Sequence, residues 1–255
     1  MVDASATPDA YVNLSGPVFA PDHIVDVAIT MKPADWDALR MQTRSFNSII
    51  EGDWLAQPFP SPFSTFEAAV VVDGTSFVPR QEYLGLEKLT LNNSKQDPAF
   101  VRQCLTYQAF AAAGVVAPRC YFAHVRVNGA DLGIFVNVET IDHHLTKKRY
   151  SDGTGTLYEG TLSDFRTDWR KTFDAKGGGD GSDLLPLINV LETATDADLL
   201  TALAPHIDLD RFMTYRAMEM LSNHWDGYAN TSTSTMTRRR AGWTSFRGAS
   251  TARCK

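Results

Sequence analysis

The hydrophobic pattern in the first part of the chain predicts a strand followed by a short helix. In HIVDVAIT (23–30), apolar and polar positions alternate as they do in a half-buried strand. KPADWDALR (32–40) then predicts a helix. Pro33 suits its first turn, where a missing backbone N–H is not needed for a hydrogen bond.

Two further segments predict β-hairpins. EAAVVVDGTSFV (67–78) contains Asp73-Gly74, and CYFAHVRVNGADLGIFVNVE (120–139) contains Asn128-Gly129. An Asp-Gly or Asn-Gly pair between apolar runs favours the two-residue turn of a hairpin. The first half of the chain is therefore expected to be rich in strands.

The clearest helix signal is DPAFVRQCLTYQAFAAAG (97–114). Asp97 is expected to accept hydrogen bonds from the first free amides, and Pro98 to occupy the first helical position. Gly114 is expected to end the helix in a left-handed conformation. The segment thus predicts one long helix inside the strand-rich half.

After Glu139 the pattern is mostly helical, and residues 196–225 form two helical stretches split by Pro205. Strands followed by helices predict an α+β fold with two lobes. We expect a polar leader at 1–22, a strand-rich N-terminal lobe at 23–139, a helical C-terminal lobe at 140–230 and a disordered tail at 231–255.

The charge is unevenly placed along the 255 residues. The net charge is −6, but residues 231–255 contain six Lys or Arg and no acid, so the rest of the chain carries −12. An acidic body argues against nucleic-acid binding, which needs basic surface. No stretch is apolar enough to cross a bilayer, and the acidic start MVDASATPDAYVNLSG does not read as a signal peptide.

Cysteine and histidine give no metal-site pattern. Cys104, Cys120 and Cys254 lack ligand spacing, and we expect two small core residues and one tail thiol. A disulfide between Cys104 and Cys120 is the alternative. His143 and His144 are adjacent, so on a helix their side chains should diverge, and we expect surface or capping histidines.

NHWDGYAN (223–230) contains a candidate catalytic turn. Asp226 follows an apolar helical stretch, so its position is expected to be fixed while the turn itself is polar. Asp226 could orient a hydroxyl nucleophile and Asn230 could help to hold Mg²⁺, as in phosphoryl transfer. The alternative is that these two residues only cap a turn, because the pattern is short.

The central run QEYLGLEKLTLNNSKQDPAFVRQCLTYQAFAAAGVVAPRCYFAHVRVNGADLGIFVNVETID resembles the CotH kinase family. So do GTLYEGTLSDFR and NHWDGYAN, and the resemblance runs from about Val18 to Asn230. It implies a protein-kinase-like, two-lobed fold and phosphorylation of a protein substrate with ATP and Mg²⁺, in spore coats or at cell surfaces. By resemblance, Asp226 matches the catalytic aspartate, and Glu139 falls between the lobes near the adenine site.

The chain departs from the family pattern before the long helix. Between Pro79 and Gln81 a glycine-containing strand and the strand with the nucleotide-binding lysine are missing. Lys88 lies in the following segment and does not replace that lysine. The helix also has no acid to pair with a lysine, and Gln103 is its nearest polar candidate.

The second departure follows Asn230. Family members continue with segments resembling NNFYLYHDP and DFIPWGVD, whose last Asp binds metal. Restoring one nucleotide after Asn230 permits both segments in the other reading frame. It also places an asparagine where Thr231 stands. We therefore interpret 231–255 as a frameshifted, truncated tail.

The resemblance predicts a CotH-type protein kinase homologue, and these two departures predict that the chain with this sequence is inactive. Phosphoryl transfer depends on positioning and charge neutralisation, so losing the lysine strand and a metal-binding Asp should remove most of the activity. The alternative is a non-enzymatic spore-coat or cell-surface protein whose scaffold only binds. An incomplete lobe with exposed strand edges that fails to fold stably is a third reading.

Overall fold

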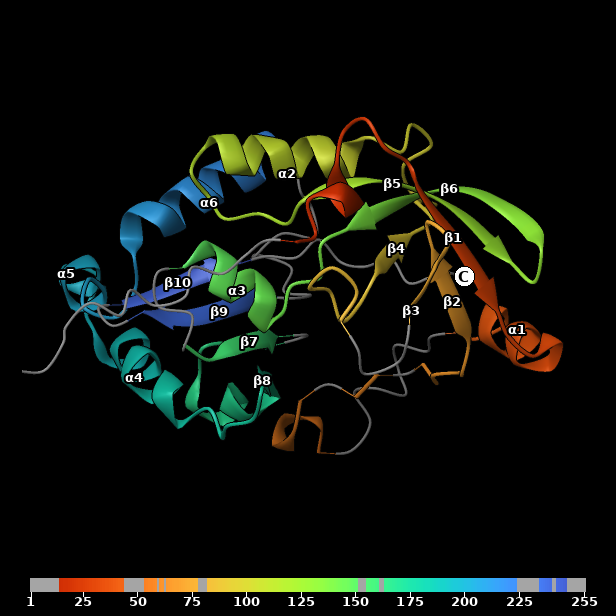
Figure 1. The fold of residues 1–255 in the computed structure, drawn as a ribbon. Helices are drawn as coiled ribbons and strands as arrows, with labels where there is room; N and C mark the ends of the chain where they lie inside the picture. The colour runs from red at the N-terminus through yellow and green to blue at the C-terminus, as the bar shows by residue number, and fades with distance from the viewer. Residues whose placement is uncertain are drawn as a thin grey trace, which may run out of the picture.

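The computed structural model describes residues 14–43, 53–58, 60–61, 63–77, 82–150, 155–160, 163–223, 234–239 and 242–246. It is a mixed α/β structure with a curled six-stranded sheet and several helices, most of them in the C-terminal part (Figure 1). No helix among these residues is long and apolar enough to span a membrane.

The large sheet combines strands from the whole first half of the chain. Its strand order is β3-β2-β1-β5-β6-β4; β1 and β5 are parallel and the other neighbours antiparallel. The strands are β1 (Val25–Thr30), β2 (Ala69–Val72), β3 (Thr75–Phe77), β4 (Thr90–Asn92), β5 (Cys120–Val127) and β6 (Ala130–Val138).

Both predicted hairpins and the first strand–helix unit are confirmed. Asp73 and Gly74 have φ values of 47° and 77° in the β2–β3 turn, and Asn128 and Gly129 have 51° and 80° in the β5–β6 turn. Two consecutive left-handed residues fit a type I′ turn, whose twist matches that of the strands. α1 (Pro33–Arg40) follows β1 as expected.

One face of the sheet forms the first core, whose buried residues come from the early strands and from β5 and β6. The short 3-10 helix η1 (Pro17–Phe19) covers it, with Val18 1% exposed and Phe19 9% exposed. The side-chain amide of Asn137 donates to the Val18 carbonyl at 2.9 Å. This part of the predicted polar leader therefore packs against the sheet.

α2 (Arg102–Ala112) covers the other face, but it begins later than Pro98, where the sequence placed its start. Asp97 accepts hydrogen bonds from the amides of Ala99 and Arg102, as expected of a capping residue. Phe100, with φ of 60°, interrupts the helical conformation before the first turn. The end is as predicted, since Gly114 has φ of 79°.

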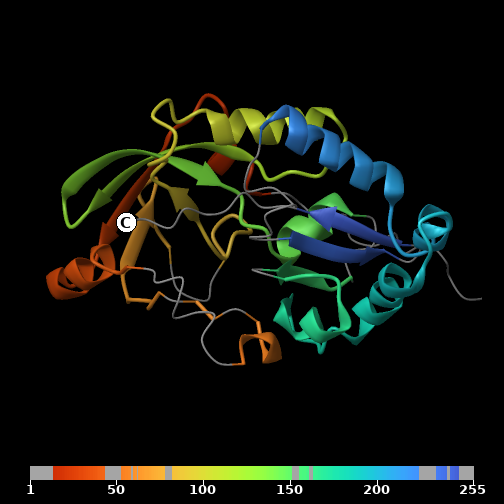
Figure 2. The same ribbon diagram turned by 180° about the vertical axis from the view of Figure 1, so that it is seen from behind.

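A second helix, α6 (Leu209–Leu221), runs beside α2, and both views show the two helices together (Figures 1 and 2). The rings of Phe110 and Tyr215 meet edge to face at 5.6 Å. Packing between α2 and α6 thus joins the strand-rich half to the C-terminal half.

The C-terminal part is less helical than the sequence predicted. A second sheet has the order β10-β9-β7-β8, and β9 and β10 lie in the segment for which the composition predicts disorder. Its strands are β7 (Leu157–Gly160), β8 (Phe173–Lys176), β9 (Ser234–Arg239) and β10 (Gly242–Phe246). The helices are α3 (His143–Arg149), α4 (Leu185–Thr193) and α5 (Leu199–Leu203), with 3-10 turns η3 (Trp54–Ala56), η4 (Thr167–Thr172) and η5 (Ser182–Leu184).

Candidate functional site

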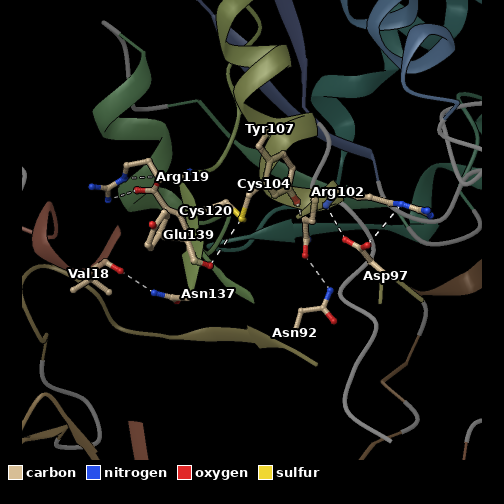
Figure 3. Close-up of a disulfide and its surroundings, with 12 residues drawn as sticks. Val18, Asn92, Asp97, Arg102, Cys104, Tyr107, Arg119, Cys120, Asn137 and Glu139 are labelled. Atoms are coloured by element: carbon tan, nitrogen blue, oxygen red, sulfur yellow. Dashed lines mark hydrogen bonds and ion pairs between the residues drawn. A yellow bond between two sulfur atoms is a disulfide. The ribbon is translucent and has the colours of Figure 1, made fainter. Parts of the chain in front are cut away.

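Glu139 directly follows β6 and precedes α3. Its side chain is 2% exposed and is held by the Arg119 guanidinium, with Nη2 to Oε1 at 2.7 Å and Nε to Oε2 at 3.1 Å. Lys148 of α3 donates to Oε1 at 3.2 Å. The carboxylate therefore lies inside an ion cluster that joins the sheet to α3, and Figure 3 shows its contact with Arg119.

The electrostatics of this cluster favour the ionised acid. Burial alone would raise the pKa of Glu139, but the hydrogen bonds and charge of Arg119, with the charge of Lys148, bring that pKa below its ordinary value. Ser15 adds a hydroxyl that accepts from Arg119 and Lys148 at 2.7 and 3.2 Å. The sequence reasoning missed these partners, and a buried carboxylate that stays ionised needs such cations near it.

A second polar group lies between the sheet and α2. The Asn92 side-chain amide of β4 donates to Gln103 Oε1 at 3.0 Å, and the Gln103 amide contacts the Tyr107 hydroxyl at 3.4 Å. All three side chains are neutral, and α2 contains no acidic residue. Gln103 is thus hydrogen-bonded to two neutral side chains, on the helix in which the sequence offered no acid.

A disulfide fixes α2 to the sheet next to this network. Cys104 of α2 and Cys120 of β5 are bonded, with their Cα atoms 5.1 Å apart (Figure 3). The sequence left this bond as an alternative to two free core thiols, and the structure contains it. Helix and strand are therefore covalently joined beside Gln103.

The two adjacent histidines do not diverge as the sequence argument expected. Their ring centroids are 3.9 Å apart, and both side chains offer a nitrogen to the same region as the Glu87 carboxylate. Asp142 caps α3 by accepting from the amides of His144 and Leu145, so the histidines occupy its first turn. The expectation was surface or capping histidines: His143 is exposed, but His144 is only 7% exposed and is not a surface residue.

Three other expectations lie outside the described residues. They are the candidate catalytic Asp226, the candidate metal ligand Asn230, and the junction between Pro79 and Gln81 where the lysine strand is missing. Among the predicted site residues, the structure therefore describes the surroundings of Glu139 and Gln103. These two belong to separate groups, one charged and one neutral.

Comparison with known proteins gives one family and one curated relative. The family model described as "CotH kinase protein" matches residues 72–244, which is more than half of the chain. This match begins at Val72, the last residue of β2. It continues beyond Asn230 into the segment interpreted as frameshifted.

The curated relative is the inner spore coat protein H of Bacillus subtilis (strain 168). It is 23% identical over 168 residues, which cover 61% of this chain and 46% of the relative. The chain thus spans about half the length of the curated relative it matches.

Proposed function

Because this chain belongs to the CotH kinase family, we propose that it is a kinase-like protein with little or no phosphoryl transfer activity of its own. The parent reaction would move a phosphoryl group from Mg-ATP to a protein hydroxyl. A two-lobed kinase-like scaffold is supported by the order of the elements. The six-stranded sheet and α2 come first, and a C-terminal part with several helices follows.

The neutral network of Gln103 carries this proposal. Protein kinases need a lysine on the strand before a helix and a glutamate on that helix, because the ion pair holds the ATP phosphates. In this chain α2 has no acid, and Gln103 is hydrogen-bonded to Asn92 of the preceding strand at 3.0 Å. An amide pair supplies no charge to neutralise phosphate.

The described residues therefore do not fit ATP in the way an active kinase requires, and we derive no catalytic step through the nucleotide. Glu139 is proposed to lie near the adenine site, but its carboxylate is bound by Arg119 and Lys148. Asp226 and Asn230 keep their proposed roles of orienting a hydroxyl and helping to hold Mg²⁺, as in kinases.

The test is phosphate incorporation from labelled ATP into the chain itself and into an added basic protein, with Mg²⁺ and with Mn²⁺. Asp226→Asn is the matched control, since it keeps shape and removes the proposed base. We expect the same incorporation for both proteins. Incorporation that depends on Asp226 would show an active kinase and overturn the proposal.

A non-enzymatic role at a cell surface or in a coat is the second candidate, and the disulfide favours it. Disulfides persist in oxidising compartments and are rare in reducing cytosol. The Cys104–Cys120 bond therefore supports a location outside the reducing cytosol. Thermal unfolding with and without Mg-ATP tests whether the scaffold still binds nucleotide, because a ligand that binds only the folded state raises its stability. A higher melting temperature with Mg-ATP would favour the kinase-like candidate, whereas an unchanged melting temperature together with a tightly bound protein partner would favour the second.

A further inference from the structure

We infer that Glu87, His143 and His144 form a binding site for one divalent transition-metal ion of the Zn²⁺ type. Each residue offers one ligand atom, and these atoms lie within 4.8 Å of one another. His143 and His144 come from the first turn of α3, and Glu87 from the segment between the Tyr83–Leu86 bridge and β4. Two segments far apart in sequence thus converge on one point.

A buried nitrogen without a hydrogen bond points to a ligand. The His144 side chain is 9% exposed, and its Nε2 has no hydrogen-bond partner among the residues that the structure describes. The nearest acids are Glu87 Oε1 at 3.4 Å and Glu82 Oε1 at 3.7 Å, and neither contact has hydrogen-bond geometry. Buried polar atoms are nearly always satisfied, so an orphaned one calls for an explanation such as an ion.

The spacing of the ligand atoms suits a small metal ion. Zn²⁺ bonds to imidazole nitrogen and carboxylate oxygen are about 2.0–2.2 Å long, so two ligands at a tetrahedral angle lie about 3.4 Å apart. Glu87 Oε1 and His144 Nε2 are already 3.4 Å apart. The remaining separations, up to 4.8 Å, need only small side-chain rotations of exposed residues.

The ligand types select the class of metal. Imidazole suits Zn²⁺ and its neighbours, whereas Mg²⁺ and Ca²⁺ prefer oxygen ligands alone. Two histidines with one carboxylate is a donor set found in zinc sites that keep a fourth position for water. Glu82 Oε1 lies 3.7 Å from His144 Nε2. The site is therefore distinct from the Mg²⁺ that accompanies ATP in kinases.

Bound metal would link the loop before β4 to the beginning of α3. The loop belongs to the strand-rich half, and α3 is the first helix after Glu139. We therefore expect the ion to stabilise the junction between the two halves, because a ligand that binds only the folded state raises its stability.

The test uses the full chain, without an affinity tag and stripped with EDTA. We expect calorimetry to show one equivalent of Zn²⁺ bound, and millimolar Mg²⁺ or Ca²⁺ not to compete. Co²⁺ in the same site should give the visible absorption of a tetrahedral centre. Glu87→Gln and His143→Ala change exposed residues and should fold, yet weaken Zn²⁺ binding roughly tenfold or more.

Glu67→Gln and His23→Ala are the matched controls, since both side chains are exposed and lie outside the site. They should bind Zn²⁺ as the parent protein does. Two results would overturn the inference. One is no Zn²⁺ binding by the parent protein. The other is unchanged binding in Glu87→Gln and His143→Ala, which would place the metal elsewhere.

Discussion

Arg119 and Glu139 close the open end of the β5–β6 hairpin with four hydrogen bonds. The two side chains form a bidentate ion pair, the Arg119 amide donates to Glu139 Oε2 at 3.1 Å, and the Glu139 amide donates to the Arg119 carbonyl at 2.8 Å. Arg119 also lies over the ring of Phe19 at 4.5 Å from its centroid. This pair therefore connects the hairpin to the first core.

Replacing Glu139 by glutamine should destabilise the protein. The change leaves Arg119 and Lys148 without their acid, and removing one partner of a buried ion pair costs about 3 kcal/mol or more. The free energy of unfolding in urea measures the effect. Glu67→Gln, at an exposed position, should change it by less than about 0.5 kcal/mol. Equal stability of the two variants would contradict the prediction.

The same pair predicts how stability depends on pH. The folded pKa of Glu139 lies below its ordinary value of 4.5, so its contribution is complete above that value and is lost as the pH falls through the folded pKa. The free energy of unfolding in urea should therefore fall more steeply below pH 4.5 for the parent protein than for Glu139→Gln. Parallel curves for the two proteins would show that Glu139 does not contribute.

Breaking the disulfide should lower stability without abolishing the sheet. Cys104 and Cys120 are 16 residues apart, and a loop of about this length is worth about 3 kcal/mol in the chain-entropy account. Urea unfolding of the double variant Cys104→Ser, Cys120→Ser measures the loss, with Cys254→Ser as the control. Dithiothreitol should lower the free energy of unfolding of the parent protein by a similar amount and leave that of the double variant unchanged. A reducing agent without effect on the parent would argue against the bond.

Short-range signals in the sequence predicted the strand-rich half well. Asp73-Gly74 and Asn128-Gly129 are local turn signals, and the structure has both turns. The start of α2 was wrong because Phe100 adopts a left-handed φ, which no propensity indicates for a large aromatic residue. The strands β7 and β8 were missed because four-residue segments such as LYEG and FDAK carry too little alternation.

The candidate site shows where sequence reasoning ends. The position of Glu139 between the two halves could be predicted, but its partners Arg119 and Lys148 could not, because the pairing depends on the tertiary fold. The histidines were misjudged for a related reason. An ideal helix separates adjacent side chains, but at the first turn of α3 both rings can turn towards Glu87. The family match then added membership of the CotH kinase family, which the geometry alone does not give.

The contact between α2 and α6 gives the last prediction. Tyr215 is 2% exposed; its ring packs against Phe110, and its hydroxyl donates to Glu219 at 2.6 Å. The exposed apolar residues of α6 do not hold it in place, since Met220 is 77% exposed. We therefore expect Tyr215→Ala to cost about 3–5 kcal/mol and Met220→Ala less than about 0.5 kcal/mol.

Tyr215→Phe separates packing from hydrogen bonding in the same position. It keeps the ring against Phe110 but leaves the buried Glu219 with one donor fewer, so we expect a loss of about 1.5–3 kcal/mol in urea unfolding. If Tyr215→Phe has the same free energy of unfolding as the parent protein, packing alone accounts for the contact. If Tyr215→Ala also has the free energy of unfolding of the parent protein, the contact with α2 does not hold α6 in place.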